Sequence, residues 1–177
     1  MSLYWTPMAV PSTSKPEGSE GHTYTQRAGL VLTWPYLERL FETREALEAP
    51  GKRQRLLGYL ATGLSDLTEA DPLEALLAEA EADTAMPDPE LWTAEDAELC
   101  EGLLHAITQN WPPLQDTSIE GLRETFLIRP GRLTELQGRT QLVVEKGPFD
   151  MLLDQLPWSI STIHPSWMAK PLMVKWR

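Results

Sequence analysis

Apolar residues recur at helical spacing through the first two-thirds of the chain, and this pattern predicts a series of short helices. The first apolar run begins at Ala28 and leads to Pro35, a residue that suits the first turn of a helix. One face of this predicted helix is formed by Leu37, Leu40 and Phe41. Pro50 and Gly51 are expected to end the element.

Two further helices follow in the sequence. An apolar stripe of Leu56, Leu60 and Leu64, reinforced by Leu57, predicts the second helix, and Gly63 is a typical helix stop. The third is expected to begin at Asp71, whose side chain can accept a hydrogen bond as N-cap. Pro72 then occupies the first turn, and Glu74 stands three residues after the cap.

The fourth and fifth helices carry similar start signals. Thr93 and Asp96 have the spacing of a capping box, and Pro112 should stop the helix that they open. Its apolar positions are Leu99, Leu103, Ile107 and Trp111. Thr117 and Glu120 have the same spacing and open the fifth helix, which should end before Pro130. Its apolar positions are Ile119, Leu122 and Phe126.

Beyond residue 130 the apolar pattern changes to a period of two. Two apolar runs, 133–136 and 142–145, flank Gln137-Gly138 and predict a β-hairpin. Alternation at Trp158 and Ile160, and again at Leu172, Val174 and Trp176, predicts further strands. Between them, Pro148 is expected to start one more helix, with Phe149, Leu152, Leu153 and Leu156 on one face.

These elements predict an α+β fold, in which a group of about five helices precedes a small, mostly antiparallel C-terminal sheet with one further helix. Residues 1–26 are rich in Pro, Gly, Ser and Thr and lack periodicity, so we expect a flexible arm there. Residues 27–177 are then expected to form one domain, which is reasonable for a chain of 177 residues.

Charge narrows the classes of function. The formal net charge of −11 opposes binding to phosphate backbones and anionic lipid, so we expect neither nucleic acid nor a membrane as partner. Residues 64–101 hold 13 acidic and no basic side chains, whereas residues 123–177 hold eight basic and five acidic ones. The acidic stretch is a solvated helical face or a patch for a basic partner. No apolar run reaches membrane-spanning length, and the start lacks the pattern of a signal peptide, so a cytoplasmic protein is predicted.

Catalytic constellations are sparse. The three histidines, His22, His105 and His164, have no metal-ligand spacing, so we expect no metal and no cofactor. Cys100 stands between apolar and acidic neighbours, which would raise its pKa. Asp150 and Asp154 are four residues apart and could resemble an acid and base pair, but without a partner motif a polar outer face or a helix cap is the favoured interpretation. The sequence therefore predicts a protein without enzymatic activity.

Tryptophan is unusually frequent, with seven in the chain. Large rigid indole rings are common in hydrophobic cores, at sharp changes of chain direction, and as anchors of binding surfaces. Trp158 lies in a predicted strand region, and Trp167, Met168 and Trp176 lie near the C-terminal strand, so all four are candidate interface residues. Arg123 is a fifth candidate: it either pairs with Glu120 or Glu124, or anchors a partner protein.

Several blocks of residues, in order, resemble the C-terminal domain of contractile injection system tape measure proteins. The blocks are residues 28–32, 34–37, 40–41, 58–63, 110–114, 117–127, 149–158, 167–168 and 171–172. Within them, the residues that carry the motif, mainly for folding, are Trp34, Pro35, Phe41, Tyr59, Gly63, Trp111, Gly121, Leu122, Phe126, Asp150, Leu156 and Pro157.

The resemblance implies a structural role in a phage-tail-like particle. It predicts docking to the inner tube, the hub or spike, or the baseplate, and a contribution to tube length, with three-fold or six-fold self-association as a further expectation. Assembly would occur in the cytoplasm, and the chain could stay in the finished particle. Because 177 residues include no long helical or repeat region, only the terminal module of a ruler is expected here. The alternative is a soluble chaperone or adaptor that binds a particle or cargo protein through its acidic helical face.

Overall fold

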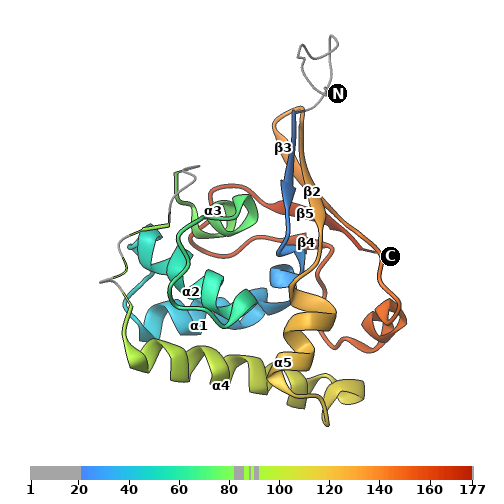
Figure 1. Cartoon of the computed structure of the whole chain (residues 1–177). Coiled ribbons are helices and arrows are strands. Elements are labelled where there is room, and N and C mark those ends of the chain that lie inside the picture. The colour runs from blue at the N-terminus through green and yellow to red at the C-terminus, as the bar shows by residue number, and fades with distance from the viewer. Residues whose placement is uncertain (1–20, 82–85, 88, 90–91, 177) are drawn as a thin grey trace, which may run out of the picture.

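The computed structural model describes residues 21–81, 86–87, 89 and 92–176 (Figure 1). In chain order, the helical part contains η1 (Ala28–Thr33), α1 (Trp34–Thr43), α2 (Pro50–Thr62), α3 (Pro72–Ala78), α4 (Ala94–Asn110), η3 (Pro112–Leu114), α5 (Ile119–Leu122) and η4 (Arg123–Leu127). The strands are β1 (Gly21–Thr25), β2 (Gly131–Leu136), β3 (Arg139–Val144), β4 (Thr162–Ile163) and β5 (Leu172–Lys175), and η5 (Asp150–Gln155) lies between β3 and β4.

The helix starts follow the predicted capping chemistry. The Asp71 carboxylate accepts the Leu73 N–H at 2.9 Å and begins α3. Thr93 and Asp96 form the expected capping box of α4. Gly63 ends α2 with a φ of 76°, a left-handed conformation that glycine adopts at little cost. Pro50 does not end α1 as predicted; it occupies the first turn of α2, where its missing N–H is not needed.

The fifth predicted helix is shorter and changes type along its length. Ser118, and not Thr117, is its N-cap, because the Ser118 hydroxyl accepts the Gly121 N–H at 3.0 Å. One α-helical turn then passes into the π-helical turn η4, which begins at Arg123. The helix predicted from Pro148 is instead the 3-10 helix η5.

The five strands form one sheet in the order β1-β2-β3-β5-β4. The predicted hairpin is confirmed: β2 pairs antiparallel with β3, and Gln137 and Gly138 occupy its turn with φ values of 55° and 78°. β1 and β4 also pair antiparallel with their neighbours, but β3 and β5 run parallel, so the sheet is mixed. The hairpin and β1 extend beyond the helices (Figure 1).

Two predictions about the sheet were wrong. Residues 21–25, which were expected in the flexible arm, form strand β1, so the sheet begins before Arg27; residues 1–20 of that predicted arm lie outside the described residues. Trp158 and Ile160 are not in a strand; β4 is only two residues long and begins at Thr162. The sheet therefore combines the N-terminal strand with C-terminal ones, and the helices are inserted between β1 and β2.

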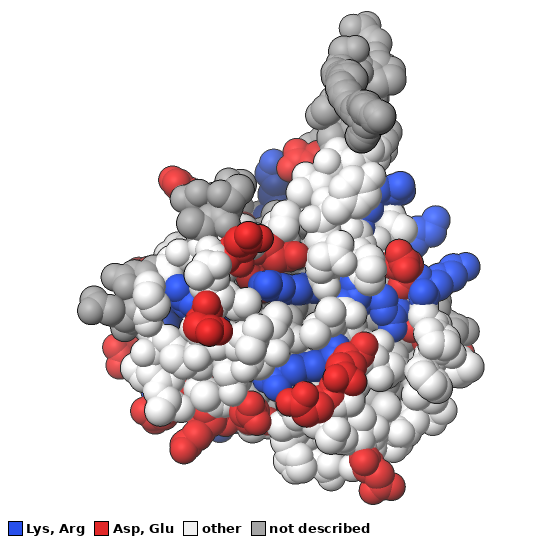
Figure 2. Space-filling view, viewed as in Figure 1, with Lys and Arg blue, Asp and Glu red and all other residues white. Residues whose placement is uncertain are grey.

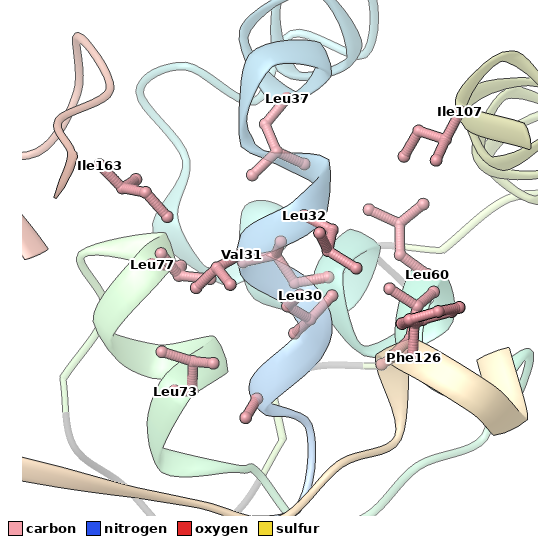
Figure 3. Close-up of a cluster of buried hydrophobic side chains, with 14 of the residues drawn as sticks. Leu30, Val31, Leu32, Leu37, Leu60, Leu73, Leu77, Ile107, Phe126 and Ile163 are labelled. Atoms are coloured by element: carbon pink, nitrogen blue, oxygen red, sulfur yellow. The ribbon is translucent and has the colours of Figure 1, made fainter. Parts of the chain in front are cut away.

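The hydrophobic core lies between the helices and one face of the sheet (Figure 3). η1 passes through its centre, where Leu30, Val31 and Leu32 are fully buried. At Gly29 a Cβ atom would stand 1.7 Å from the carbonyl oxygen of Phe126, so only glycine allows η1 and η4 to approach this closely. The sheet contributes Leu133, Leu142, Ile163, Leu172 and Val174.

Candidate functional site

The Arg123 guanidinium is used inside the chain. It is 5% exposed, and it donates to the carbonyl oxygens of Leu60 and Tyr59 at 3.1 Å each. These carbonyls belong to the last turn of α2, where a cation is favoured by the helix dipole. Arg123 also lies 5.3 Å from the centre of the Tyr59 ring. Arg123 therefore caps α2, which accounts for the burial of its charge.

Arg123 does pair with a carboxylate, but not with either of the two residues named from the sequence. Its ion pair is with Glu101 of α4 at 3.7 Å, and not with Glu120 or Glu124. The Tyr59 hydroxyl donates to the same carboxylate at 2.7 Å. Burial and this hydrogen bond to Glu101 raise the pKa of Tyr59. Arg123, Tyr59 and Glu101 thus form one cluster that joins α2, α4 and η4.

The tryptophans of the predicted interface bind carbonyl groups of distant segments. The Trp158 indole N–H donates to the Leu32 carbonyl at 3.0 Å, and its ring meets Tyr36 edge-on at 5.3 Å. The Trp34 indole donates in the opposite direction, to the Ser159 carbonyl at 2.9 Å. This pair of indoles fastens the segment around residue 158 to η1 and α1. Trp158 is only half-buried, so part of its ring faces outward.

Trp167 and Met168 fasten the segment before β5. The Trp167 indole donates to the Leu77 carbonyl at the end of α3 at 2.7 Å, and its ring meets Phe41 at 4.8 Å. Met168 is 5% exposed and belongs to the core. Trp167 is half-buried, so its outer edge remains a candidate for contact with a partner.

Trp176 belongs to a buried charge cluster that the sequence analysis did not predict. Its indole donates to Asp150 at 2.9 Å, and Arg129 contacts both oxygens of the same carboxylate at 3.0 Å. Asp150 and Arg129 are 4% and 6% exposed. Arg129 also donates to the carbonyl oxygens of Thr125 and Glu145. A buried aspartate requires a cation, but nothing in the sequence spacing marks Arg129 as that cation.

The remaining motif residues lie mostly in the core. Trp111 is fully buried beside Phe126, with ring centres 4.8 Å apart, and donates to the Leu152 carbonyl at 3.0 Å. Phe41 and Leu122 are fully buried as well. Pro35 and Pro157 are exposed, whereas Trp34, Gly121 and Leu156 are half-buried.

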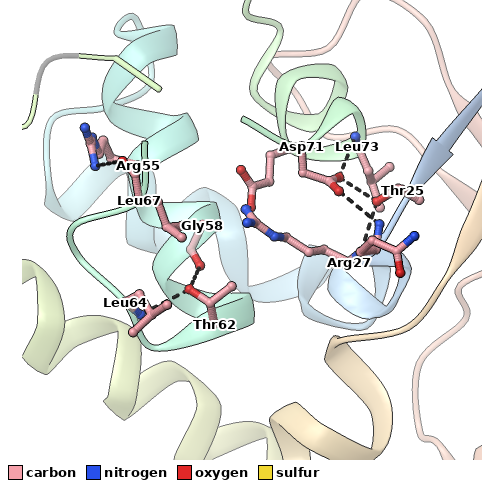
Figure 4. Close-up of polar contacts among 11 residues, drawn as sticks. Thr25, Arg27, Arg55, Gly58, Thr62, Leu64, Leu67, Asp71 and Leu73 are labelled. Atoms are coloured by element: carbon pink, nitrogen blue, oxygen red, sulfur yellow. Dashed lines mark hydrogen bonds and ion pairs between the residues drawn. The ribbon is translucent and has the colours of Figure 1, made fainter. Parts of the chain in front are cut away.

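A second buried polar network joins β1 to α3 (Figure 4). The Thr25 hydroxyl donates to Asp71 at 2.5 Å, and the Gln26 N–H donates to the other carboxylate oxygen at 3.0 Å. Arg27 pairs with the buried Glu74 carboxylate. This network holds the end of β1 against the start of α3, and it explains why β1 belongs to the fold.

Asp96 is the centre of a third charge cluster. Its buried carboxylate accepts from Arg44 at 2.6 Å, from Lys52, and from the Thr93 N–H at 2.7 Å. Burial alone would raise the pKa of Asp96, but the hydrogen bonds from Lys52, Arg44 and Thr93 outweigh it and lower the pKa below its ordinary value. Asp96, the third helical residue of the α4 capping box, therefore also links α4 to Arg44, which follows α1, and to Lys52 of α2.

Two of the candidate reactive groups, Cys100 and Asp150, are buried in the fold. Cys100 is fully buried in the core, and burial raises the pKa of its thiol. The Asp150 carboxylate accepts hydrogen bonds from Arg129 inside the fold, whereas Asp154 is exposed, so the two carboxylates do not share a site. Within the described residues, no group of three or more His, Cys, Asp or Glu side chains could hold a metal ion.

Two hollows lie along α1. A groove of about 440 Å³ between α1 and α4 has Tyr36, Leu40, Leu99 and Leu103 among its lining residues. We call it the helical groove. An adjoining hollow of about 800 Å³, bordered by Glu38 and Glu42, separates α1 from residues 164–167. Figure 2 shows most acidic side chains at the left and bottom, over the helices, and most basic ones at the right, over the strands and η5.

Most of the motif residues are buried or form hydrogen bonds within the chain, and in this way they hold the segments of the domain together. Residues 5–176 match the family model of the contractile injection system tape measure protein. The chain therefore belongs to this family, and the match covers nearly all of it. It extends the predicted resemblance, which began at Ala28, toward the N-terminus.

No curated protein and no solved structure matches the chain. In the part of the chain that the structure describes, no helix has the length and apolar character needed to cross a membrane.

Proposed function

We propose that this protein is a non-enzymatic assembly component of a contractile injection system, which docks to the tube, hub or baseplate and contributes to control of tube length. The observation that carries the proposal is the family match over residues 5–176. It agrees with a fold in which the motif side chains are engaged in internal packing and hydrogen bonds.

The dimensions of the domain favour docking over spanning. The longest described helix, α4, has 17 residues, and at about 1.5 Å per residue it extends only about 25 Å. A length-setting role would then come from binding at one end of the growing tube, during assembly in the cytoplasm. Three-fold or six-fold association would match the symmetry of such a particle.

The test is deletion of the gene in its host, followed by electron microscopy of the particles. Loss of particles, or a broad distribution of their lengths, would support the proposal. Particles of normal number and length would contradict it. Complementation with the unaltered gene should restore number and length, which controls for effects on neighbouring genes.

A second candidate is a chaperone or adaptor that uses the acidic helices and leaves before the particle is complete. The 13 acidic residues in 64–101 favour it, and Glu95 and Glu98 on α4 are exposed. Mass spectrometry of purified particles separates the two, because a docking component remains in the particle and a chaperone does not. A chaperone bound through carboxylates should also release its client as ionic strength rises.

A further inference from the structure

The larger hollow beside α1 combines two kinds of side chain that favour the same ligand. Its lining includes the indole rings of Trp34 and Trp167 and the carboxylates of Glu38 and Glu42. With a volume of about 800 Å³, it is large enough to receive a long side chain from another protein. We call this site, defined by these four residues, the indole hollow.

The two indoles offer ring surface to the hollow and no hydrogen-bond donor. The Trp34 N–H donates to the Ser159 carbonyl at 2.9 Å, and the Trp167 N–H donates to the Leu77 carbonyl at 2.7 Å. Both donors are therefore used inside the chain, although both rings are half-buried and line the hollow. The face of an indole is electron-rich, and among aromatic rings it attracts a cation most strongly. The rings thus favour a cationic ligand over a hydrogen-bond acceptor.

The two carboxylates add negative charge to the same site. Glu38 and Glu42 are exposed and stand four residues apart, so they lie on the same side of α1. Glu38 accepts the hydroxyl of Ser166, which lines the same hollow, at 2.8 Å. Neither carboxylate forms an ion pair with a residue in the described part of the chain. Both are therefore available to a cation from outside, and Ser166 holds Glu38 in place.

The other titratable residues of the lining leave this excess of negative charge. Among the described residues that line the hollow, Arg39 is the only Lys or Arg. It also lines the helical groove, so it stands where the two hollows adjoin. His164 lines the hollow as well, and its Nε2 donates to the Met168 carbonyl at 3.1 Å. Two carboxylates against one guanidinium make the site complementary to a further cation.

We propose that the indole hollow binds an arginine side chain of a partner protein. The guanidinium would lie against the indole rings and donate to Glu38 and Glu42, because a planar guanidinium both stacks on aromatic rings and pairs with carboxylates through two donors. A lysine ammonium is more strongly hydrated, so it is expected to bind less tightly. The identity of the partner rests on the proposed function, because the arginine would belong to a component of the tube, hub or baseplate.

Nuclear magnetic resonance titration of the full chain with a short peptide tests the ligand directly. The probe is acetyl-Gly-Arg-Gly-amide, and the control is acetyl-Gly-citrulline-Gly-amide, which has nearly the same shape without the charge. The arginine peptide should bind with a dissociation constant of about 1 mM, at least about fivefold more tightly than the control. The indole N–H signals of Trp34 and Trp167 should shift, and that of the buried Trp111 should not. Absence of binding, equal affinity for the two peptides, or shifts confined to other tryptophans would overturn the proposal.

Charge changes on α1 give a sharper test, because they act in opposite directions. Glu38→Gln with Glu42→Gln should weaken binding of the arginine peptide about fivefold, whereas Arg39→Gln should strengthen it about twofold by removing a competing cation. Glu124→Gln removes an exposed carboxylate that does not line the hollow, and it should leave the affinity unchanged. All these residues are exposed, so circular dichroism and melting temperature should match those of the parent chain. An affinity that Glu124→Gln lowers as much as the double variant does would contradict the proposal.

Particle assembly separates a failure of the indole hollow from a failure of the proposed function. Where deletion of the gene alters the particles, the gene carrying Glu38→Gln with Glu42→Gln should restore fewer of them than the unaltered gene does, and the gene carrying Glu124→Gln should restore them fully. Full restoration by the double variant would contradict docking through the hollow, while the proposed function would stand. Where deletion leaves the particles unchanged, the proposed function fails, and the peptide titration still decides whether the hollow binds arginine.

Discussion

The helical group and the segment from residue 145 to residue 176 are stabilised in different ways. Helices α1 to α4 have local signals at their starts, such as Asp71 before α3 and Thr93 before α4, and they bury leucines along one side. The C-terminal segment has only η5 and two short strands. Besides the pairing of β5 with β3, indole N–H groups and the buried ion pair of Asp150 with Arg129 attach it to the rest of the domain. A region with few attachments depends more strongly on each of them.

The largest effect is expected at the buried ion pair. Asp150→Ala removes the carboxylate but leaves the Arg129 charge buried, and it also removes the acceptor of Trp176. Breaking such a pair from one side should lower the free energy of unfolding by about 3–5 kcal/mol. Urea denaturation measures this. The exposed Asp154→Ala, four residues along, is the matched control and should cost less than about 1 kcal/mol. If Asp150→Ala and Asp154→Ala lowered the free energy of unfolding equally, the buried ion pair would not be a main attachment of the C-terminal segment, and the contrast with the helical group would fail.

The next effect concerns the helical group. Arg123→Met keeps much of the side-chain volume but leaves the Tyr59 and Leu60 carbonyls without their donors. We expect a loss of about 2–3 kcal/mol in the free energy of unfolding. The exposed Arg132→Met removes the same charge from the sheet and should change stability by less than about 0.5 kcal/mol. A small effect at Arg123 would mean that α2 does not need its C-terminal cation.

A single indole donor should have a smaller effect. Trp167→Phe preserves an aromatic ring against Phe41 but removes the donor to the Leu77 carbonyl. The expected loss is about 1–2 kcal/mol, measured by the same denaturation. Trp92→Phe is the control, because the Trp92 ring packs on Tyr59 and is expected to lose less than about 0.5 kcal/mol. If both substitutions cost the same, packing and not hydrogen bonding attaches this segment.

The smallest effect is the response to acid. Because the pKa of Asp96 is lowered in the folded chain, the unfolded chain binds a proton at this carboxylate more readily than the folded chain does. The contribution of Asp96 to stability is therefore complete above pH 3.8, the ordinary pKa of the group, and is lost as the pH falls through the pKa of the folded chain. Asp96→Asn should cost about 1 kcal/mol at neutral pH and flatten the acid limb of the stability curve. An unchanged acid limb would show that Asp96 is not the group responsible.

The local structure of the helical group could be predicted from the sequence, because its signals are local. The caps at Asp71 and Thr93 and the stop at Gly63 each depend on residues within one turn. The hairpin turn at Gln137-Gly138 is local as well. The strand β1 was missed because its residues, GHTYT, show little apolar alternation; its place is set by β2 and by the distant Asp71.

The side-chain clusters could not be predicted in the same way. Trp158 and Ile160 alternate as in a strand, but the Trp158 indole is directed to Leu32, far away in the sequence. The partners of Arg123 and Asp150 lie on other elements, and several acidic or basic residues could have served equally well. The residue types show which side chains need a partner, but the packing of the helices and strands determines which partner each of them has.

The order of the strands has a consequence for how fast this domain folds. Every helix from η1 to η4 lies between β1 and β2 in the sequence, and β5 pairs between β3 and β4 although it follows both of them in the chain. Contacts of such long sequence separation require large loops to close before any stabilisation is gained. We therefore expect the helices to form early, and completion of the sheet to set the overall folding rate and to leave strand edges exposed to other chains in the meantime.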